Sequence, residues 1–387
     1  MKTVRLGIIG VGNMGTGHSE RILAGNIPNM ELTAVCDINP DRIVAFKEKF
    51  SAEVATFDDA ETMMDSGLCD AILVSVPHYD HPKYSMMAMK KGLHVMCEKP
   101  AGVYTKQVVE MNECAKACDV TFAMMFNQRT NCVYRKMKEI VDSGELGEIK
   151  RVNWIITSWY RPQFYYDSGA WRATWEGEGG GVLLNQCPHN LDLVQWICGM
   201  PSKVTAFCHE GKWHDIEVED DVTAYLEYPN GATGTFITTT GETPGTNRFE
   251  ISFDGGKLVC EKDTLTLHKL DMFESEYSRT TEIAFGHPHA TVTEIETDGL
   301  NEQHDGVLRA FTNHILEGTP LIAGGEEGLQ GLTLSNSMHL SSWLGQAVTL
   351  PLDEDLFLAE LDKRRANSRV KKDVVAKVSD TSGSYNN

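Results

Sequence analysis

The chain has 387 residues, of which 41% are hydrophobic and 23% charged, and a formal net charge of −20 at pH 7. This length exceeds what one hydrophobic core usually supports, so we expect two domains. An acidic chain argues against nucleic acid as a partner, because phosphate binding requires a basic surface. No run approaches the roughly 20 apolar residues of a membrane helix, and residues 4–10 are too short an apolar run for a signal peptide.

The ten cysteines indicate reduced thiols. Most lie inside apolar runs, as small buried hydrophobic residues do, and no two of them form a CxxC pair. Cys114 and Cys118 are four residues apart on one expected helix. We therefore expect a cytoplasmic protein without disulfides or structural zinc.

The first motif is a glycine-rich turn between an apolar strand, residues 4–9, and a helix. The turn consists of Gly10, Val11, Gly12, Asn13, Met14 and Gly15. Its three glycines permit a tight turn, a close approach of the backbone to a pyrophosphate, and close packing of helix on strand. The free N–H groups at the start of the helix suit the phosphates. The motif therefore predicts dinucleotide binding.

A second strand, residues 32–36, ends in Asp37, 22 residues after the last glycine of the turn. An acidic side chain at this place accepts both ribose hydroxyls of an adenosine and repels a 2′-phosphate. The uncharged Ile38 and Asn39 also favour NAD over NADP, whereas Arg42 on the next helix weakens that preference.

Apolar strands then alternate with helices as far as residue 127, which predicts an NAD-binding Rossmann domain with a doubly wound parallel sheet. Ligands of such sheets bind in the crevice beyond the carboxyl ends of the strands. At the end of the strand at residues 71–76, this crevice receives Ser75, Val76, Pro77, His78 and His81. The two histidines have no third ligand nearby, so we expect no metal.

The run at residues 94–100 ends an apolar strand abruptly on Glu98, Lys99 and Pro100. Lys99 is therefore a candidate for contact with a reacting group in the same crevice, with Glu98 on the cofactor side. The alternative is that Glu98 and Lys99 form a solvated corner between strand and loop. Asn127, which follows the last expected strand of this domain, completes the candidate cofactor residues.

Residues 128–370 form the expected second domain, an α+β unit for substrate binding and oligomerisation. Hairpin signals at residues 230–231 and 255–256 predict a large, mostly antiparallel open sheet of five or more strands, with one face available for an interface. Residues 371–387 are polar and are expected to form a frayed C-terminal tail.

Residues 159–192 concentrate aromatic side chains with arginines between them. Flat aromatic faces with polar edges hold sugar-like rings, and arginine suits the phosphate or carboxamide of a cofactor. We assign Trp159, Arg161 and Tyr166 to the substrate, and Trp171 and Arg172 to the cofactor. The alternative is that the aromatic residues form the hydrophobic core of a large loop.

A helix is expected at residues 185–198, because Pro188 is tolerated only in a first turn. Asn185, His189 and Asp192 then share one face of this helix, which predicts a joint role at the substrate. For Asn185 the alternative is a role as the N-cap of the helix.

Together these motifs resemble the glucose–fructose oxidoreductase and inositol dehydrogenase (Gfo/Idh/MocA) family. The resemblance is carried by the turn at 10–15, Asp37, Glu-Lys-Pro at 98–100, WRATW at 171–175, and three glycines followed by Asn185, His189 and Asp192. It implies a Rossmann domain plus an open antiparallel sheet domain, an NAD(P) cofactor, and redox chemistry at a secondary alcohol of a sugar or cyclitol. It also implies that Lys99 orients the reacting hydroxyl, that His189 is the acid/base, and that sheet faces pair subunits into homodimers or homotetramers.

One position departs from the family, whose dehydrogenases commonly carry Asp four residues before the histidine, where this chain has Asn185. An amide at this place argues against a carboxylate-assisted proton relay but leaves Lys99 and His189 in place. Relatives with Asn here and an aromatic, arginine-rich loop often handle glycosides or larger sugars, which favours that substrate class over free inositols.

Oxidation of a secondary alcohol requires a base for the hydroxyl proton and a cation for the developing alkoxide. Lys99 and His189 both suit the base, and the sequence does not choose between them. Three hypotheses follow: an NAD-dependent sugar or glycoside dehydrogenase, a redox-neutral enzyme that cleaves or epimerises a glycoside through a transient keto-sugar with recycled NAD, and a non-catalytic NAD-sensing protein. Intact Lys99 and His189 argue against the third.

Overall fold

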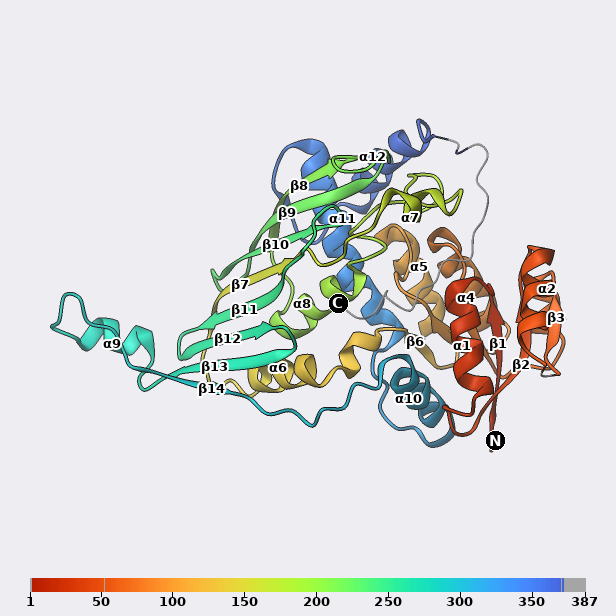
Figure 1. The fold of residues 1–387 in the computed structure, drawn as a ribbon, viewed down its shortest axis with the longest axis horizontal. Helices are drawn as coiled ribbons and strands as arrows, with labels where there is room; N and C mark the ends of the chain where they lie inside the picture. Colours follow the sequence, from red (N-terminus) through yellow and green to blue (C-terminus); the bar gives the residue numbers. More distant parts are fainter. Residues whose placement is uncertain (1, 52, 370, 372–387) are drawn as a thin grey trace.

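The computed structural model describes residues 2–51, 53–369 and 371. Its two sheets, one parallel and one mostly antiparallel, lie beside each other in Figure 1. The expected tail at 371–387 lies outside the described residues apart from Lys371, whose ammonium donates a hydrogen bond to the carbonyl of Tyr166.

The first sheet has six parallel strands in the order β3-β2-β1-β4-β5-β6. Their bounds are β1 (Val4–Ile9), β2 (Met30–Cys36), β3 (Ala55–Phe57), β4 (Ala71–Val74), β5 (His94–Cys97) and β6 (Phe122–Met124). Helices connect them: α1 (Asn13–Leu23), α2 (Pro40–Lys49), α3 (Ala60–Asp65), η1 (His78–Asp80), α4 (His81–Lys90) and α5 (Thr105–Lys116). The predicted doubly wound sheet is confirmed, and its strand order reverses between β1 and β4, where such sheets bind ligands.

Local capping explains where two of these helices begin. Asn39 accepts a hydrogen bond from the backbone N–H of Asp41, and Pro40 occupies the first helical position of α2. The carboxylate of Asp59 caps α3 by accepting a hydrogen bond from the backbone N–H of Thr62. Asp37 therefore directly follows β2, in the short connection that leads to the start of α2.

The second sheet has nine strands in the order β14-β13-β12-β11-β7-β10-β9-β8-β15. Their bounds are β7 (Ile149–Ile156), β8 (Lys203–Glu210), β9 (Glu219–Glu227), β10 (Thr233–Thr239), β11 (Asn247–Phe253), β12 (Gly256–Glu261), β13 (Thr264–Leu270), β14 (Ala290–Glu294) and β15 (Val348–Thr349). All pairs are antiparallel except β7 with β10, which confirms the mostly antiparallel sheet.

Several of the remaining elements cover one face of this sheet, others pack on the first domain, and one helix between β13 and β14 projects beyond the sheet and buries none of its residues (Figure 1). They are η2 (Asn127–Thr130), α6 (Cys132–Asp142), α7 (Gln163–Asp167), α8 (Pro188–Cys198), α9 (Glu274–Thr280), α10 (Gln303–Glu317), η3 (Gly325–Glu327), α11 (Gly328–Leu344) and α12 (Glu354–Arg365). Apolar side chains of α6, α8 and α11 pack with those of the strands in one core, and these helices lie between the two sheets (Figure 1). The other face keeps Phe207 and Tyr225 exposed.

Helix α10 returns to the first domain although it follows the second sheet in sequence. Its residues Val307, Leu308 and Phe311 share a core with Leu6 and Ile8 of β1. The division of the chain at residue 127 therefore stays a prediction, because the chain crosses between the two sheets more than once. All ten cysteines are free thiols. None of the helices in the described part is long and apolar enough to cross a membrane.

Candidate active site

The glycine turn adopts the geometry that its sequence predicts. Gly10 has a φ of +89°, and a Cβ placed on it would lie 2.5 Å from the carbonyl oxygen of Ser75. A Cβ on Gly15 would lie 1.9 Å from the carbonyl oxygen of Gly10, so the close packing of α1 on β1 requires glycine. At Gly12 only the guanidinium of Arg42 comes within 4 Å of such a Cβ, at 3.6 Å, which leaves the backbone open to a ligand.

Asp37 lies at the end of β2 beside this turn. Its Oδ2 accepts the backbone N–H of Val11 at 3.0 Å, and its Oδ1 accepts that of Asn39 at 2.9 Å. The guanidinium of Arg42 lies 3.4 Å from the same carboxylate. Two backbone donors thus fix the carboxylate where a ribose would lie. Helix α1 begins at Asn13, directly after the turn, and the positive end of a helix suits phosphates. These residues fit an NAD molecule.

The loops after β4 and β5 are tied to each other by His81. Its two ring nitrogens lie 2.7 Å from the carbonyl oxygen of Val76 and 2.6 Å from that of Pro100. Burial lowers the pKa of His81, although both carbonyl contacts favour the protonated ring. His81 therefore connects the segment Ser75, Val76 and Pro77 to the Glu-Lys-Pro segment, and the Ser75 hydroxyl in turn donates to the carbonyl of Gly10.

Glu98 points into the protein, towards α1. Its carboxylate lies 2.6 Å from Nε2 of His18, and its other oxygen accepts the backbone N–H of Lys99. Burial acts to raise the pKa of Glu98, but the hydrogen bond and the charge of His18 lower it to about 2. Glu98 thus fixes the backbone that carries Lys99, and this pairing argues against a solvated corner.

Lys99 reaches across to the second domain. Its Nζ donates to the backbone carbonyl of Asn185 at 3.0 Å. Burial lowers the pKa of Lys99, and the charges of Arg161 and Arg172 act in the same direction, whereas those of Glu98 and Glu178 raise it. The ammonium has three hydrogens, so this one contact leaves donors for a substrate.

His189 lies in the first turn of α8 and is 6% exposed. Among the described residues neither of its ring nitrogens has a hydrogen-bond partner, and the ring of Phe126 lies 6.4 Å away, edge to face. Burial, and then the charge of Lys99, hold the pKa of His189 well below its usual range. The ring is therefore neutral and has a nitrogen able to accept a proton.

The helix start expected near Asn185 is wrong by three residues. Helix α8 begins at Pro188 with Cys187 as its N-cap, so Asn185 neither caps the helix nor lies on it. It lies in a preceding turn, which Glu219 fixes by accepting the N–H groups of Gly181 and Leu183. The expectation rested on Pro188 as a residue of the first turn; the proline is in fact the first residue of the helix, so the residues before it belong to a separate turn.

Asn185 nevertheless faces the site. Its amide nitrogen donates to the carboxylate of Glu178, and its amide oxygen accepts from the hydroxyl of Tyr165 at 3.2 Å. Tyr165 in turn accepts a hydrogen bond from Arg172 at 2.7 Å. The structure therefore brings Lys99, Asn185 and Arg172 into one connected set of polar contacts.

Asp192 and Tyr166 have partners within the protein. Asp192 is 1% exposed and accepts two hydrogen bonds from the guanidinium of Arg129, at 2.7 and 2.8 Å. The hydroxyl of Tyr166 lies 2.7 Å from that of Thr240. Both side chains are thus held by partners within the protein, and their contact with the substrate stays a prediction. Asn127, the first residue of η2, donates a hydrogen bond from its amide to the side-chain oxygen of Gln303.

Half-buried aromatic rings and guanidinium groups alternate along the aromatic stretch. The guanidinium of Arg161 lies 5.7 Å from the ring of Trp159 and 5.4 Å from that of Tyr165. Arg172 lies 4.5 Å from Tyr165 and 4.8 Å from Trp171. The ring of Trp171 also meets that of His78, whose Nδ1 lies 3.3 Å from the carbonyl of Glu178. The core alternative holds for Tyr166 and Trp175, which are both 3% exposed.

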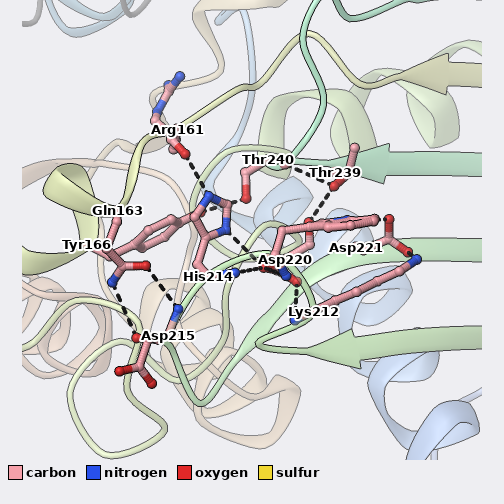
Figure 2. A network of polar contacts seen from close by, with 12 residues as sticks. Arg161, Gln163, Tyr166, Lys212, His214, Asp215, Asp220, Asp221, Thr239 and Thr240 are labelled. Atoms are coloured by element: carbon pink, nitrogen blue, oxygen red, sulfur yellow. Dashed lines mark hydrogen bonds and ion pairs between the residues drawn. The ribbon is translucent and has the colours of Figure 1, made fainter.

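A second polar network holds this stretch to the sheet (Figure 2). The ring of His214 lies between the carbonyl of Arg161, 2.8 Å from Nε2, and the carboxylate of Asp220, 2.9 Å from Nδ1. Asp220 also accepts the backbone N–H groups of Lys212, Trp213 and His214. The loop at 211–216 thus fixes Arg161 relative to β9.

These features define a class of protein, an NAD-binding oxidoreductase with a Rossmann domain and a second sheet domain. Residues 4–126 match the oxidoreductase family model with an NAD-binding Rossmann fold, and residues 134–259 match the GFO/IDH/MocA C-terminal domain. The chain belongs to the Gfo/Idh/MocA family, which confirms the resemblance and the NAD cofactor expected from the sequence.

Two relatives and one solved structure illustrate the similarity. Myo-inositol 2-dehydrogenase of Thermotoga maritima is 26% identical over 339 residues, 86% of this chain and 94% of the relative. D-glucoside 3-dehydrogenase of Escherichia coli is 25% identical over 363 residues, 90% of this chain and 97% of the relative. The WlbA dehydrogenase of Bordetella pertussis, in complex with NADH and UDP-GlcNAcA, has a TM-score of 0.76 and 25% identity, and covers 91% of this chain and 99% of that one.

Sequence reasoning missed three contributors to the site. Glu178 lies in a glycine-rich run, where a charged residue is expected to belong to a solvated loop. In the structure the residue is only 2% exposed. His18 lies eight residues after Gly10 on α1, and its burial and its contact with Glu98 appear only in the structure. Tyr165 lies within the aromatic stretch at 159–192, but its hydrogen bond to Asn185 depends on the fold of both segments.

Proposed function

We propose that this protein oxidises a secondary hydroxyl of a sugar, glycoside or cyclitol by hydride transfer to NAD. The observation that carries this proposal is the buried, neutral His189, with neither ring nitrogen bonded within the described part of the chain. Next to it the ammonium of Lys99 extends from the cofactor domain. A base and a cation are what alcohol oxidation requires.

In this mechanism the bound nicotinamide supplies the acceptor for the hydride. The substrate hydroxyl donates its proton to a ring nitrogen of His189 and accepts a hydrogen bond from Lys99. The alkoxide that develops is stabilised by the ammonium, whose charge also keeps His189 neutral before the reaction. In this proposal Asn185, Trp159, Arg161 and Tyr165 contact the substrate, and Trp171 and Arg172 contact the cofactor.

The relatives support a polyol substrate. Their names describe enzymes that act on inositol and on glucosides, and the solved structure holds a sugar nucleotide. The aromatic faces alternating with guanidinium groups suit a ring with hydroxyls at its edge. Asn185, an amide at the place of a carboxylate, favours glycosides over free inositols.

The test is to incubate the protein with NAD and a panel of glycosides and cyclitols, and to follow both NADH absorbance and the sugar product. Net NADH with a keto-sugar product is expected. A cleaved or epimerised sugar without NADH would instead establish the redox-neutral alternative. Tight NAD binding without change in any substrate would contradict both and leave NAD sensing.

We also propose a homodimer or homotetramer through the outer face of the nine-stranded sheet. Phe207 on β8 and Tyr225 on β9 are 64% and 42% exposed on this face, and strands β8 and β9 are neighbours in the sheet. Covering them would remove apolar surface from water. Light scattering of the purified protein, and of its Phe207→Asp variant, tests this: a monomeric unmutated protein contradicts the proposal.

A further inference from the structure

Glu178 is a buried carboxyl group that the proposed reaction does not yet use. It precedes the glycines at 179–181 and is 2% exposed. One carboxyl oxygen accepts the backbone N–H of Ala173 at 2.5 Å, and the other accepts the amide of Asn185. Ala173 has a φ of +52°, an unfavourable conformation for a residue with a Cβ, and it aims its N–H at this carboxylate.

The hydrogen bonds that lead to Glu178 all run in one direction. Arg172 donates to the hydroxyl of Tyr165, which donates to the amide oxygen of Asn185, whose amide nitrogen donates to Glu178. The chain therefore begins at a cation and ends at an anion, and each member has only one orientation that satisfies its neighbours. Gln186 adds a second donor to the amide oxygen of Asn185 at 3.2 Å.

Asn185 is also the residue that holds Lys99, because its backbone carbonyl accepts the ammonium. A side chain anchored at Glu178 thus fixes the carbonyl on which Lys99 rests. The negative charge of Glu178 also acts on Lys99 directly and favours its protonated form.

We propose that Glu178 supplies the carboxylate that position 185 lacks, and acts as a positioning residue that locks Asn185 and thereby holds Lys99 in place with its charge. The family's dehydrogenases commonly carry a carboxylate at position 185. In this chain Asn185 has an amide there, and the neighbouring Glu178 supplies the carboxylate. The inference rests on the proposed function, since it concerns the same Lys99.

An exchange of the two side chains tests this directly. In Glu178→Gln the carboxylate is lost, and in Asn185→Asp two carboxylates meet. The double variant combines Glu178→Gln with Asn185→Asp. Its amide at position 178 donates to the carboxylate at position 185, and the amide oxygen at position 178 still accepts the N–H of Ala173. Tyr165 can donate to that carboxylate as well, so every donor and the net charge are restored. A sugar hydroxyl accepts or donates as required, so the substrate contact survives.

Each single variant should lower kcat/KM about 10-fold or more, the range for a lost hydrogen bond to a charged group. Glu178→Gln should also move the alkaline limb of the pH profile to lower pH, because Lys99 loses a stabilising negative charge. The double variant should recover kcat/KM to within about threefold of the unmutated protein, in line with restored pairing, and return the alkaline limb to its original place. The control is Glu176→Gln, an exposed carboxyl group two residues away that pairs with Arg365; it should change neither quantity.

Thermal unfolding of the unmutated protein, the two single variants and the double variant gives a readout that needs no substrate. Both single variants should lower Tm, and the double variant should regain most of the loss. A double variant no better than the worse single variant, in Tm or in kcat/KM, overturns the inference, as does an unmoved alkaline limb in Glu178→Gln. Recovery of Tm without recovery of turnover also overturns it, because the pair would then be architectural only. Failure of the proposed function is seen separately, as a lack of NADH formation by the unmutated protein.

Discussion

The glycine turn with Asp37 and the substrate side with Lys99, Asn185 and His189 are built in different ways. In the turn, function depends on backbone geometry: glycines without a Cβ and N–H groups that hold one carboxylate. On the substrate side it depends on side chains that come from distant segments, as in the contact of Lys99 with Asn185, 86 residues away. The first kind of site can be read from a short motif, whereas the second becomes visible only in the fold.

The two regions differ in electrostatics as well. On the substrate side burial shifts the pKa of each main group: it lowers those of Lys99 and His189 and raises that of Glu178. Shifted titratable groups collected in one crevice are typical of chemistry rather than of binding alone. The comparison therefore assigns cofactor binding to the turn and chemistry to the substrate side, and substitutions in each region should have separable effects.

The largest effect is expected from Lys99→Met, which removes the cation but keeps the length of the side chain. Turnover should fall by roughly 10²-fold or more, the scale of a lost alkoxide-stabilising contact. The affinity for NAD, measured by calorimetry, and Tm should change little. Near-normal turnover with a shifted Tm would show that Glu98 and Lys99 form a structural corner instead.

Glu98→Gln sharpens the comparison from the side of stability. The pKa of Glu98 is about 2 in the folded protein against a usual value of 4.5, so its ionised form contributes stability that is present above pH 4.5 and is lost as the pH falls towards 2. Removing it should cost about 3 kcal/mol at neutral pH, as for other broken buried pairs. The variant should also lose less stability than the unmutated protein between pH 4.5 and 3. Equal acid sensitivity of the two proteins in denaturant unfolding would contradict the pairing with His18.

Asp37→Ala acts on the other region alone. The affinity for NAD should fall about 10-fold, since the ribose hydroxyls lose a charged acceptor, and discrimination against NADP should relax. Turnover at saturating NAD should be preserved. Tighter binding of NADP than of NAD by the unmutated protein would sink this assignment, and the guanidinium of Arg42, 3.4 Å from Asp37, would then be the residue to examine.

The smallest effect is expected from His214→Phe, which keeps a ring but removes both bridges of the network in Figure 2. The stretch that carries Arg161 should become less fixed, and KM for the sugar should rise about fivefold, the scale of one neutral hydrogen bond. Affinity for NAD should not change. His209→Phe, at an exposed position on β8, is the matched control. An equal rise of KM in both variants would show that the network has no role in substrate binding.

Much of the first domain could be predicted from three local patterns. Apolar strands that alternate with helices predict the parallel sheet, the spacing of the glycines predicts the turn, and the acidic residue after β2 predicts the ribose contact. Strand β1, the turn and Asp37 are where the pattern predicts them. The two hairpin turns predict the second sheet, but β13, β14 and α9 were not predicted. The sequences of β14 and α9 are exposed and resemble loops, whereas β13 alternates apolar and polar residues and buries Leu265. The parallel pairing of β7 with β10 also lay beyond any local signal.

At the site, residue types were easier to predict than their partners. Lys99 and His189 stand out because they interrupt apolar sequence, and in the structure the charge of Lys99 acts on His189 and lowers its pKa. Asp192 stands out for the same reason, yet it binds Arg129, 63 residues away. Asn185 was expected on a helix because Pro188 marks a first turn, and the turn held by Glu219 was not detectable from that signal.

The pH dependence of kcat/KM for NADH formation tests most directly whether a neutral His189 works beside a charged Lys99. Because both pKa values are lowered, activity should persist well below pH 6.5 on the acid side and should be lost below pH 10.5 on the alkaline side. His189→Asn should abolish the acid limb while leaving NAD affinity unchanged. An acid limb at or above pH 6.5, or one that persists in His189→Asn, would contradict the account.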